Sequence, residues 1–155
     1  MKITDRLRAL GYALPASAAP AANYVSATRA GSTLFISGQI AQDDGRIHRG
    51  RLGAELSVEE GCTAASAAAL NVIAQIAAAT EGRLADVAQV LKLGVFIAST
   101  PDFAEHSQVA NGASDLLVQV FGDAGRHARS AIGVAALPRG ASVEIEAIVQ
   151  LAVSP

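Results

Sequence analysis

Apolar side chains in residues 57–80 recur every three or four positions, the spacing of one face of an α-helix. Ser57 and Glu60 stand just ahead of this run and match the capping-box pattern, in which each side chain satisfies a free backbone N–H of the first turn. The pattern predicts a helix that begins after Ser57 and continues to Thr80.

A second segment with helical spacing covers residues 100–122. Thr100 is a suitable cap with Pro101 at the first helical position, and Gly122 marks the expected end. Gly112 lies in the middle of the apolar pattern and predicts a weak turn within this helix.

Four segments are rich in apolar and β-branched residues and predict strands. Residues 23–40 favour a hairpin that turns around Ala30-Gly31-Ser32. Residues 87–98 are apolar at both odd and even positions, which is typical of a strand covered on both faces. Residues 130–137 and 142–153 flank a Pro-Arg-Gly turn, and we expect them to form a final antiparallel pair.

The remaining segments predict connections and one short helix. Residues 3–11 favour a helix, residues 15–23 an extended connector, and the glycine-rich residues 43–56 a surface loop. We therefore expect an N-terminal helix and connector over residues 1–22, followed by a single domain over residues 23–155.

The predicted order ββ, α, β, α, ββ indicates an α+β fold with one mixed sheet and two helices on one face. Consecutive strand residues, which point to opposite faces of the sheet, are both apolar, as in Leu34, Phe35 and Ile36. The second face of the sheet is therefore too apolar to remain in water, and we expect other copies of the chain to cover it.

The composition fits one soluble domain of 155 residues. Apolar residues make up 51% of the chain and charged residues 17%, yet polar side chains interrupt every apolar run before it reaches membrane-spanning length. The first eight residues carry charges and lack the apolar stretch of a signal peptide, so we expect a cytoplasmic protein.

Several kinds of chemistry are not indicated. A net charge of −2 offers no basic track for nucleic acid. Cys62 lies in an alanine-rich segment, where a small buried thiol is the ordinary interpretation. His48, His106 and His127 do not combine with it in a metal-ligand spacing, so we expect neither metal nor organic cofactor.

The last predicted strand carries two glutamates that are separated by one isoleucine. Alternation places Glu144 and Glu146 on the face opposite Val143 and Ile145, about 7 Å apart, where two half-buried carboxylates would repel each other. Arg129 precedes the neighbouring predicted strand and either pairs with a glutamate or binds the carboxylate of a small ligand. Spacing alone favours the structural ion pair.

The segment "ARSAIGVAALPRGASVEIEAI" resembles the C-terminal signature of the Rid family, the reactive intermediate/imine deaminases also called the YjgF family. Upstream, "NYVSATRAGSTLFISGQI" is similar to the first hairpin of that family, with Tyr24 placed 13 residues before Ser37. The resemblance covers residues 23–153 and implies a chorismate-mutase-like α+β subunit that assembles as a homotrimer, with sites in the clefts between subunits.

In deaminating members of this family the arginine of the A-R-S motif binds the substrate carboxylate, and the first glutamate of E-I-E positions the attacking water. The resemblance assigns these roles to Arg129 and Glu144, with Glu146 as a structural neighbour. It implies cofactor-independent hydrolysis of small 2-imino or enamine acids to 2-keto acids, because an oriented water can attack an electrophilic C=N carbon.

The resemblance also implies a set of substrate-binding residues: Tyr24, Ser37, Gly38, Asn111, and the backbone of Ser130 and Ala131. Simpler interpretations stay open beside it. Tyr24 would fill an interface as a hairpin residue, and the Ser37 hydroxyl would bond to backbone within its strand.

The chain departs from the family pattern at several positions, which places it in a divergent branch with an N-terminal extension. Ala22 and Asn23 replace a usual Gly-Pro, and His127 replaces a proline before the A-R-S motif. His127 would be either a titratable group at the pocket mouth or a solvated loop residue, and a loop between two arginines favours the latter.

Two other functions remain to be weighed against the deaminase. Arg129 alone would support non-catalytic binding of a small carboxylate metabolite, whereas catalysis also needs Glu144. A ribonuclease, an old label attached to relatives of this family, is disfavoured because the chain offers no phosphate track and no paired acid and base.

Overall fold

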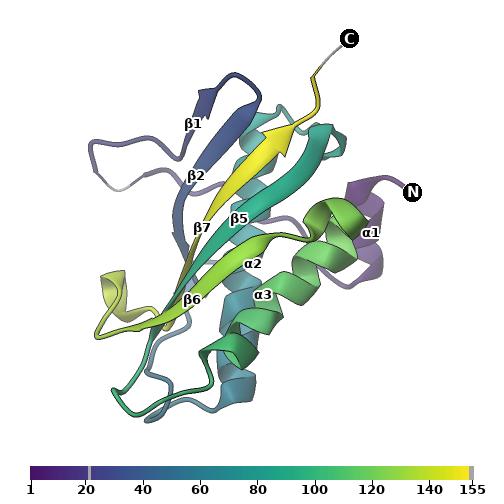
Figure 1. The fold of residues 1–155 in the computed structure, drawn as a ribbon. Coiled ribbons are helices and arrows are strands. Elements are labelled where there is room, and N and C mark those ends of the chain that lie inside the picture. The colour runs from purple at the N-terminus through teal and green to yellow at the C-terminus, as the bar shows by residue number, and fades with distance from the viewer. Residues whose placement is uncertain (21, 154–155) are drawn as a thin grey trace.

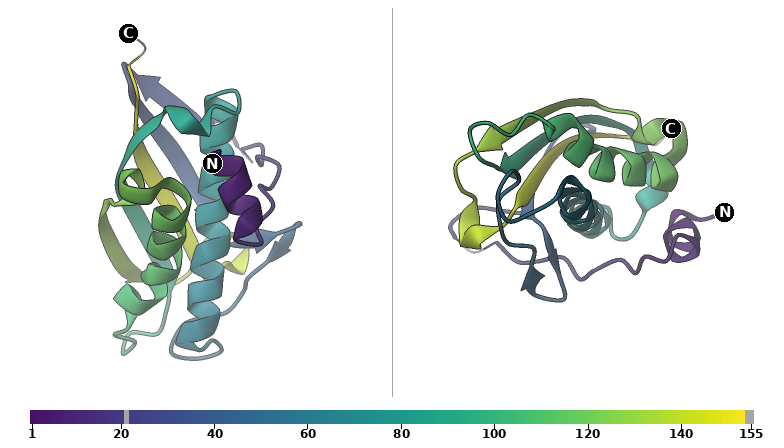
Figure 2. Two further views of the ribbon diagram at one scale, coloured as in Figure 1. Left: turned by 90° about the vertical axis from the view of Figure 1, so that its right-hand side faces the viewer. Right: turned by 90° about the horizontal axis from the view of Figure 1, so that it is seen from below.

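A twisted five-stranded sheet covered on one face by two helices forms the body of the molecule (Figures 1 and 2). The computed structural model describes residues 1–20 and 22–153. The elements are α1 (Ile3–Ala9), β1 (Ala27–Ala30), β2 (Thr33–Ile40), β3 (Gln42–Asp43), β4 (Arg46–Ile47), α2 (Val58–Ala79), β5 (Val87–Ala98), α3 (His106–Phe121), β6 (Ala128–Val134) and β7 (Val143–Leu151), with short 3-10 turns η1 (Leu84–Asp86), η2 (Gly122–Gly125) and η3 (Pro138–Gly140). The predicted α+β class is confirmed.

The strand order is β1-β2-β7-β5-β6, so β6 and β7 are not neighbours. The chain leaves β5, returns through α3 and enters β6 parallel to β5, as a crossover connection requires. It then passes through η3 to the other side of β5, where β7 pairs antiparallel with both β2 and β5. The predicted final antiparallel pair is therefore wrong, because β5 separates its two members.

Helix α2 is the core helix and agrees with the prediction. Both hydrogen bonds of the capping box are present, since Ser57 Oγ accepts from Glu60 N at 3.2 Å and Glu60 Oε2 accepts from Ser57 N at 2.7 Å. The expectation that polar side chains keep every apolar run below membrane-spanning length is wrong for α2, which is long and apolar enough by length and composition. Most of the helix is instead buried against the sheet and α3, as in the core of a globular domain.

Helix α3 begins later than predicted, at His106 rather than after Thr100. The backbone N–H of Thr100 donates to Leu52 O at 3.0 Å, which holds this segment against a loop instead of starting a helix. The weak turn expected at Gly112 is also absent from the continuous helix. A Cβ on Gly112 would lie 2.2 Å from Cys62 O, so this glycine allows α3 to cross α2 closely.

The segment predicted as a surface loop is more ordered than expected. Strands β3 and β4 pair within it, and Ile47 and Leu52 are buried. At the N-terminus, α1 is confirmed and buries Leu7 in the main core, while Arg6 Nη1 donates to Val120 O near the end of α3 at 2.9 Å. The expected division of the chain at residue 22 stays a prediction.

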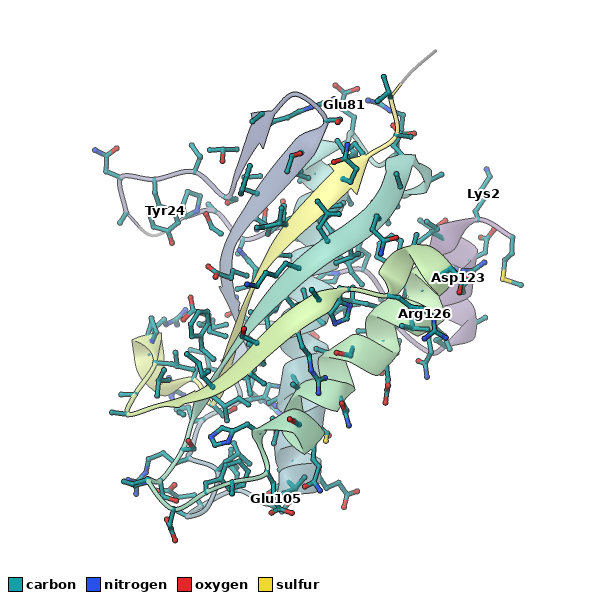
Figure 3. All side chains as sticks on the ribbon, in the orientation of Figure 1. Lys2, Tyr24, Glu81, Glu105, Asp123 and Arg126 are labelled. Carbon is teal, nitrogen blue, oxygen red and sulfur yellow. The ribbon has the colours of Figure 1, made fainter. Side chains whose placement is uncertain are left out.

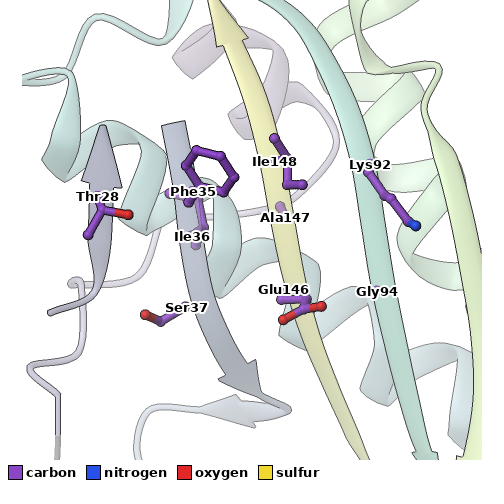
Figure 4. Close-up of a pocket in the computed structure, with 9 residues that line it drawn as sticks. All are labelled: Thr28, Phe35, Ile36, Ser37, Lys92, Gly94, Glu146, Ala147 and Ile148. Carbon is purple, nitrogen blue, oxygen red and sulfur yellow. The ribbon is translucent and has the colours of Figure 1, made fainter. Parts of the chain in front are cut away.

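The face of the sheet away from the helices is apolar and open in the single chain. Phe35 and Ile132 are among its exposed side chains, at 43% and 49%. A cavity of about 350 Å³ lies on this face. Figure 4 shows its lining residues, among them Phe35, Lys92 and Glu146. An apolar surface of this kind is typical of a face that meets another protein surface.

Candidate functional site

Arg129 lies on β6 with its guanidinium against one side of α3. Nη1 donates to Asn111 Oδ1 and to Ser114 Oγ, both at 2.9 Å, and Nη2 donates to Ser107 O at 3.1 Å. The three partners follow at intervals of four and three residues along α3, so they share one face of that helix. The structure thus places Asn111 in direct contact with the predicted carboxylate anchor.

Arg129 is not part of an ion pair. None of the salt bridges within the described residues 1–20 and 22–153 includes it. The prediction of a structural ion pair between Arg129 and Glu144 or Glu146 is therefore wrong. A guanidinium carries five N–H donors, so the three hydrogen bonds to α3 leave Nε–H and one Nη2–H for a ligand.

His127 is half-buried between η2 and α3, and both ring nitrogens form hydrogen bonds. Nδ1 lies 2.6 Å from Gly125 O and Nε2 lies 2.9 Å from Ser114 Oγ. Burial lowers the pKa of His127, the hydrogen bond with Gly125 opposes that shift, and the charge of Arg129 adds to it. The interpretation of His127 as a solvated loop residue is wrong.

Glu144 and Glu146 lie on the outer face of β7, as alternation predicts, and lean over glycines of different strands. A Cβ on Gly38 of β2 would lie 2.2 Å from Glu144 Oε1. A Cβ on Gly94 of β5 would lie 2.8 Å from Glu146 Oε1. Because β2 and β5 flank β7 on opposite sides, the two carboxylates lean apart, and neither takes part in a salt bridge with residues 1–20 or 22–153.

The Glu144 carboxylate faces a cavity of about 190 Å³ at one end of the sheet. Tyr24, Gly38 and Arg139 line it together with Ala18 and neighbouring residues of the connector. Burial raises the pKa of Glu144, and the charge of Glu146 raises it further. A half-buried carboxylate with a raised pKa beside a cavity is suited to accept a proton from water.

The other predicted site residues take different positions. The Ser37 hydroxyl donates to Val25 O at 2.7 Å, in agreement with the simpler interpretation of a hydroxyl bonded to backbone. Tyr24 is 51% exposed. Ser130 and Ala131 follow Arg129 on β6, and as an edge strand β6 has backbone N–H and C=O groups on one side without a strand partner in this chain.

Arg129 and Glu144 lie on opposite faces of the sheet. Arg129 pairs with the buried Leu93, whereas Glu144 pairs with Phe96 on the outer face. Three residue steps and two strand spacings separate them, which corresponds to about 14 Å between their Cα atoms. One chain therefore does not bring both side chains to the same small ligand.

The predicted residues thus form two separate clusters. We call the residues Asn111, Ser114 and Arg129 the arginine cluster, and the residues Tyr24, Gly38 and Glu144 the glutamate cluster. Figure 3 shows Tyr24 beside β1 and Arg126, three residues before Arg129, at the opposite edge of the sheet. The two clusters therefore belong to different sides of the molecule.

The sequence did not point to Ser114 in the arginine cluster or to Arg139, which lines the cavity beside the glutamate cluster. Ser114 follows Asn111 by three residues, and helical spacing from that asparagine would have indicated it. Arg139 has a left-handed backbone with φ of 58°, which the Pro-Arg-Gly turn does not reveal at sequence level. The connector residues at the glutamate cluster carry no charge pattern that could have marked them.

The cysteine and the metal-binding residue types add no further site. Cys62 donates to Gln108 O at 3.1 Å, and burial raises the pKa of its thiol. Within residues 1–20 and 22–153, His, Cys, Asp and Glu side chains do not gather in groups of three or more that could hold a metal ion.

Comparison with known proteins identifies the fold and its relatives. A sequence model described as "YjgF/chorismate_mutase-like, putative endoribonuclease" matches residues 4–148. The chain is 53% identical to Protein TCP17 of Trypanosoma cruzi over 152 residues, which cover 97% of this chain and 94% of TCP17.

Two solved structures share the architecture. Atu1372 from Agrobacterium tumefaciens, a protein of unknown function, superposes with a TM-score of 0.91 at 44% identity, covering 96% of this chain and 92% of its own. TdcF from E. coli with bound serine superposes with a TM-score of 0.62 at 26% identity, covering 86% and 92%.

Proposed function

The chain belongs to the YjgF/chorismate-mutase-like family, and from that premise we propose that it hydrolyses small 2-imino or enamine acids to 2-keto acids and ammonia. The reaction takes place in the cytoplasm, at a cleft between subunits of a homotrimer. The observation that carries the proposal is the guanidinium of Arg129, which α3 holds by three hydrogen bonds while two N–H donors remain for a carboxylate.

The separation of the two clusters supports a site shared between copies. The arginine cluster lies at the β6 edge of the sheet and the glutamate cluster lies toward the β1 edge. When one edge of a copy meets the opposite edge of the next, the contact is head-to-tail, and such contacts form a ring when the rotation between copies closes, as in a trimer. Each cleft of a trimer then receives Arg129 from one copy and Glu144 from its neighbour.

The proposed chemistry uses only the residues of the chain. Arg129 binds the substrate carboxylate through its free N–H donors, and the backbone after it contacts the imine nitrogen. Glu144 accepts a proton from a water as the water oxygen bonds to the C=N carbon. That proton passes to nitrogen and gives a carbinolamine; Glu144 then carries the hydroxyl proton to nitrogen as the C–N bond breaks and the C=O bond forms, so that ammonia leaves with a 2-keto acid as the second product.

Non-catalytic binding of a small carboxylate is the second candidate. The solved structure of TdcF contains serine, a small amino acid with a carboxylate. A binding protein would need the arginine cluster but not a carboxylate with a raised pKa. The position and pKa of Glu144 therefore favour the enzyme.

The direct test generates 2-iminobutanoate in solution and follows formation of 2-oxobutanoate. We expect the wild type to accelerate the reaction, Arg129→Ala to raise KM strongly, and Glu144→Gln to lower kcat by at least about 100-fold. Glu146→Gln is the matched control and should keep most of the activity. Wild-type protein that binds 2-oxobutanoate without accelerating hydrolysis would instead support the binding function.

The assembly has its own test. Sedimentation analysis should give the mass of three chains, and subunit exchange between Arg129→Ala and Glu144→Gln should give more activity than either impaired variant alone. Mixed trimers contain clefts in which both side chains are intact, because each cleft takes one residue from each neighbour. A monomer, or mixtures without recovered activity, would contradict the shared site.

A further inference from the structure

A continuous row of hydrogen bonds connects the backbone of Gly125 to the guanidinium of Arg129. His127 Nδ1 lies 2.6 Å from Gly125 O, and its Nε2 lies 2.9 Å from Ser114 Oγ. Ser114 Oγ in turn lies 2.9 Å from Arg129 Nη1. The row crosses from η2 to α3 and back to β6, so it ties together the three elements that surround Arg129.

With a neutral imidazole, the chemistry of the groups fixes the direction of every bond in this row. A carbonyl oxygen only accepts, so Nδ1 of His127 carries the proton and Nε2 is an acceptor. A guanidinium only donates, so Ser114 Oγ accepts from Arg129 and directs its own hydrogen to His127. The arrangement is complete when His127 is neutral, with its single proton on Nδ1.

The far end of the row is rigid. A Cβ on Gly125 would lie 2.2 Å from Leu117 O, so the backbone at Gly125 packs directly against α3. The side chain of Gln89 on β5 donates to Arg126 O in the same segment. Because the backbone of Gly125 and Arg126 is held by these two contacts, the Gly125 carbonyl and the imidazole that bonds to it have a fixed orientation.

We propose that His127 is a positioning residue that acts through Ser114 to fix the Arg129 guanidinium for carboxylate binding. The inference rests on the proposed function, in which Arg129 is the carboxylate anchor. His127 itself does not contact the ligand.

The burial that lowers the pKa of His127 favours the neutral imidazole the row requires. A protonated imidazole would carry hydrogen on both nitrogens. Ser114 Oγ would then face two donors and could no longer direct its hydrogen to the ring. Neutral His127 instead accepts the Ser114 hydrogen, which fixes the rotation of the hydroxyl and leaves Arg129 without a competing donor at Ser114 Oγ.

The first test does not depend on catalysis. A nitrogen-15 NMR spectrum of the imidazole should show neutral His127 with its proton on Nδ1 at pH 7. A ring protonated on Nε2 would overturn the proposal, because it could not accept from Ser114. This outcome would leave the proposed roles of Arg129 and Glu144 untouched.

The second test measures the Kd of 2-oxobutanoate together with KM and kcat for 2-iminobutanoate. We expect His127→Phe and Ser114→Ala each to raise Kd and KM about fivefold, the effect of one hydrogen bond, while kcat changes less than twofold. His127→Gln retains an acceptor that Ser114 can reach and should recover most of the affinity. The exposed Arg126→Gln is the neighbouring control and should match the wild type.

The double variant distinguishes a shared path from two independent structural effects. Because His127 acts through Ser114, combining His127→Phe with Ser114→Ala should raise Kd no further than Ser114→Ala alone. If the Kd increases of the two substitutions multiply in the double variant, or if His127→Phe keeps the wild-type Kd, the proposal is overturned. The proposed function would still stand if Arg129→Ala bound 2-oxobutanoate more weakly than the wild type. If Arg129→Ala bound as tightly as wild type, both would fail. Ser114→Ala keeps the test decisive if His127→Phe does not fold.

Discussion

The carboxylate of Glu144 occupies the space that a side chain on Gly38 would need. Glu144 Oε1 lies 2.2 Å from the position of a Cβ on Gly38, well inside van der Waals contact. The register of β2 against β7 shifts between Ile36 and Gln39, which places this glycine in an irregular part of the strand. Bulges of this kind often direct a side chain at a functional site.

Gly38→Ala should therefore displace Glu144 and reduce kcat for 2-iminobutanoate by at least about tenfold. The matched control is Gly94→Ala, which crowds Glu146 in the same way on the other side of β7. That variant should retain the wild-type kcat, provided that sedimentation shows an unchanged assembly. Equal losses in both variants would show that the effect comes from the sheet rather than from Glu144.

Glu144 should make the protein less stable at neutral pH than a neutral residue would. Its pKa is raised in the folded state, chiefly by burial, so folding favours the protonated form. The stabilising contribution is full below the unfolded pKa near 4.5 and is lost as the pH rises through the folded pKa. Glu144→Gln should raise Tm at pH 7 by about 2 °C and give no increase at pH 4.

The exposed Glu146→Gln serves as the control in the same thermal melts. It removes one negative charge from the same strand, so both variants change the net charge of the chain equally. A Tm increase in Glu146→Gln as large as that in Glu144→Gln would attribute the effect to general charge repulsion. A stabilised but inactive Glu144→Gln protein would show that function and stability compete at this position.

Periodicity predicted most of the helices and strands, because burial of one face of an element produces a regular spacing of apolar residues in its sequence. Strand β7 alternates as its two environments demand, and α2 shows both its cap and its apolar spacing. The order of the strands in the sheet produces no such pattern. Residues 130–137 and 142–153 resemble a hairpin because they are close in sequence, but the pairing partner of each is β5.

The candidate site likewise has features that the sequence predicts and features that depend on how the elements pack. Alternation alone put Glu144 and Glu146 on the outer face, and the family motif singled out Arg129. The contact between His127 and Ser114 depends on how η2 packs against α3, so no spacing in the sequence could reveal it. The opposite facing of Arg129 and Glu144 likewise follows from the crossover through α3 rather than from their distance along the chain.

The close crossing of α2 and α3 depends on Gly112. Alanine normally stabilises a helix by about 1 kcal/mol relative to glycine. Here the added Cβ would lie 2.2 Å from the backbone oxygen of Cys62, which cannot move without displacing α2. Gly112→Ala should therefore lower the free energy of unfolding by about 2 kcal/mol in urea denaturation.

Gly61→Ala provides the matched comparison within α2. Its Cβ would meet only side-chain atoms of Leu52 and Val109, at 2.8 Å and 2.9 Å, and such groups can adjust. We expect this variant to lose less stability than Gly112→Ala. The reverse order would mean that the helices separate easily and that the crossing does not constrain residue 112.

The N-terminal helix should contribute to the stability of the whole domain through Leu7. This side chain is 2% exposed and lies in the same core cluster as residues of α2 and α3. Leu7→Ala removes buried apolar volume and should lower the free energy of unfolding by about 2–3 kcal/mol in urea denaturation. Leu10→Ala is the control, because Leu10 is 38% exposed and its replacement should have a much smaller effect.

If Leu7→Ala unfolds at the wild-type urea concentration, α1 does not share the cooperative core. A single transition shifted to lower urea would instead show that α1 unfolds together with the sheet that carries Glu144 and Arg129.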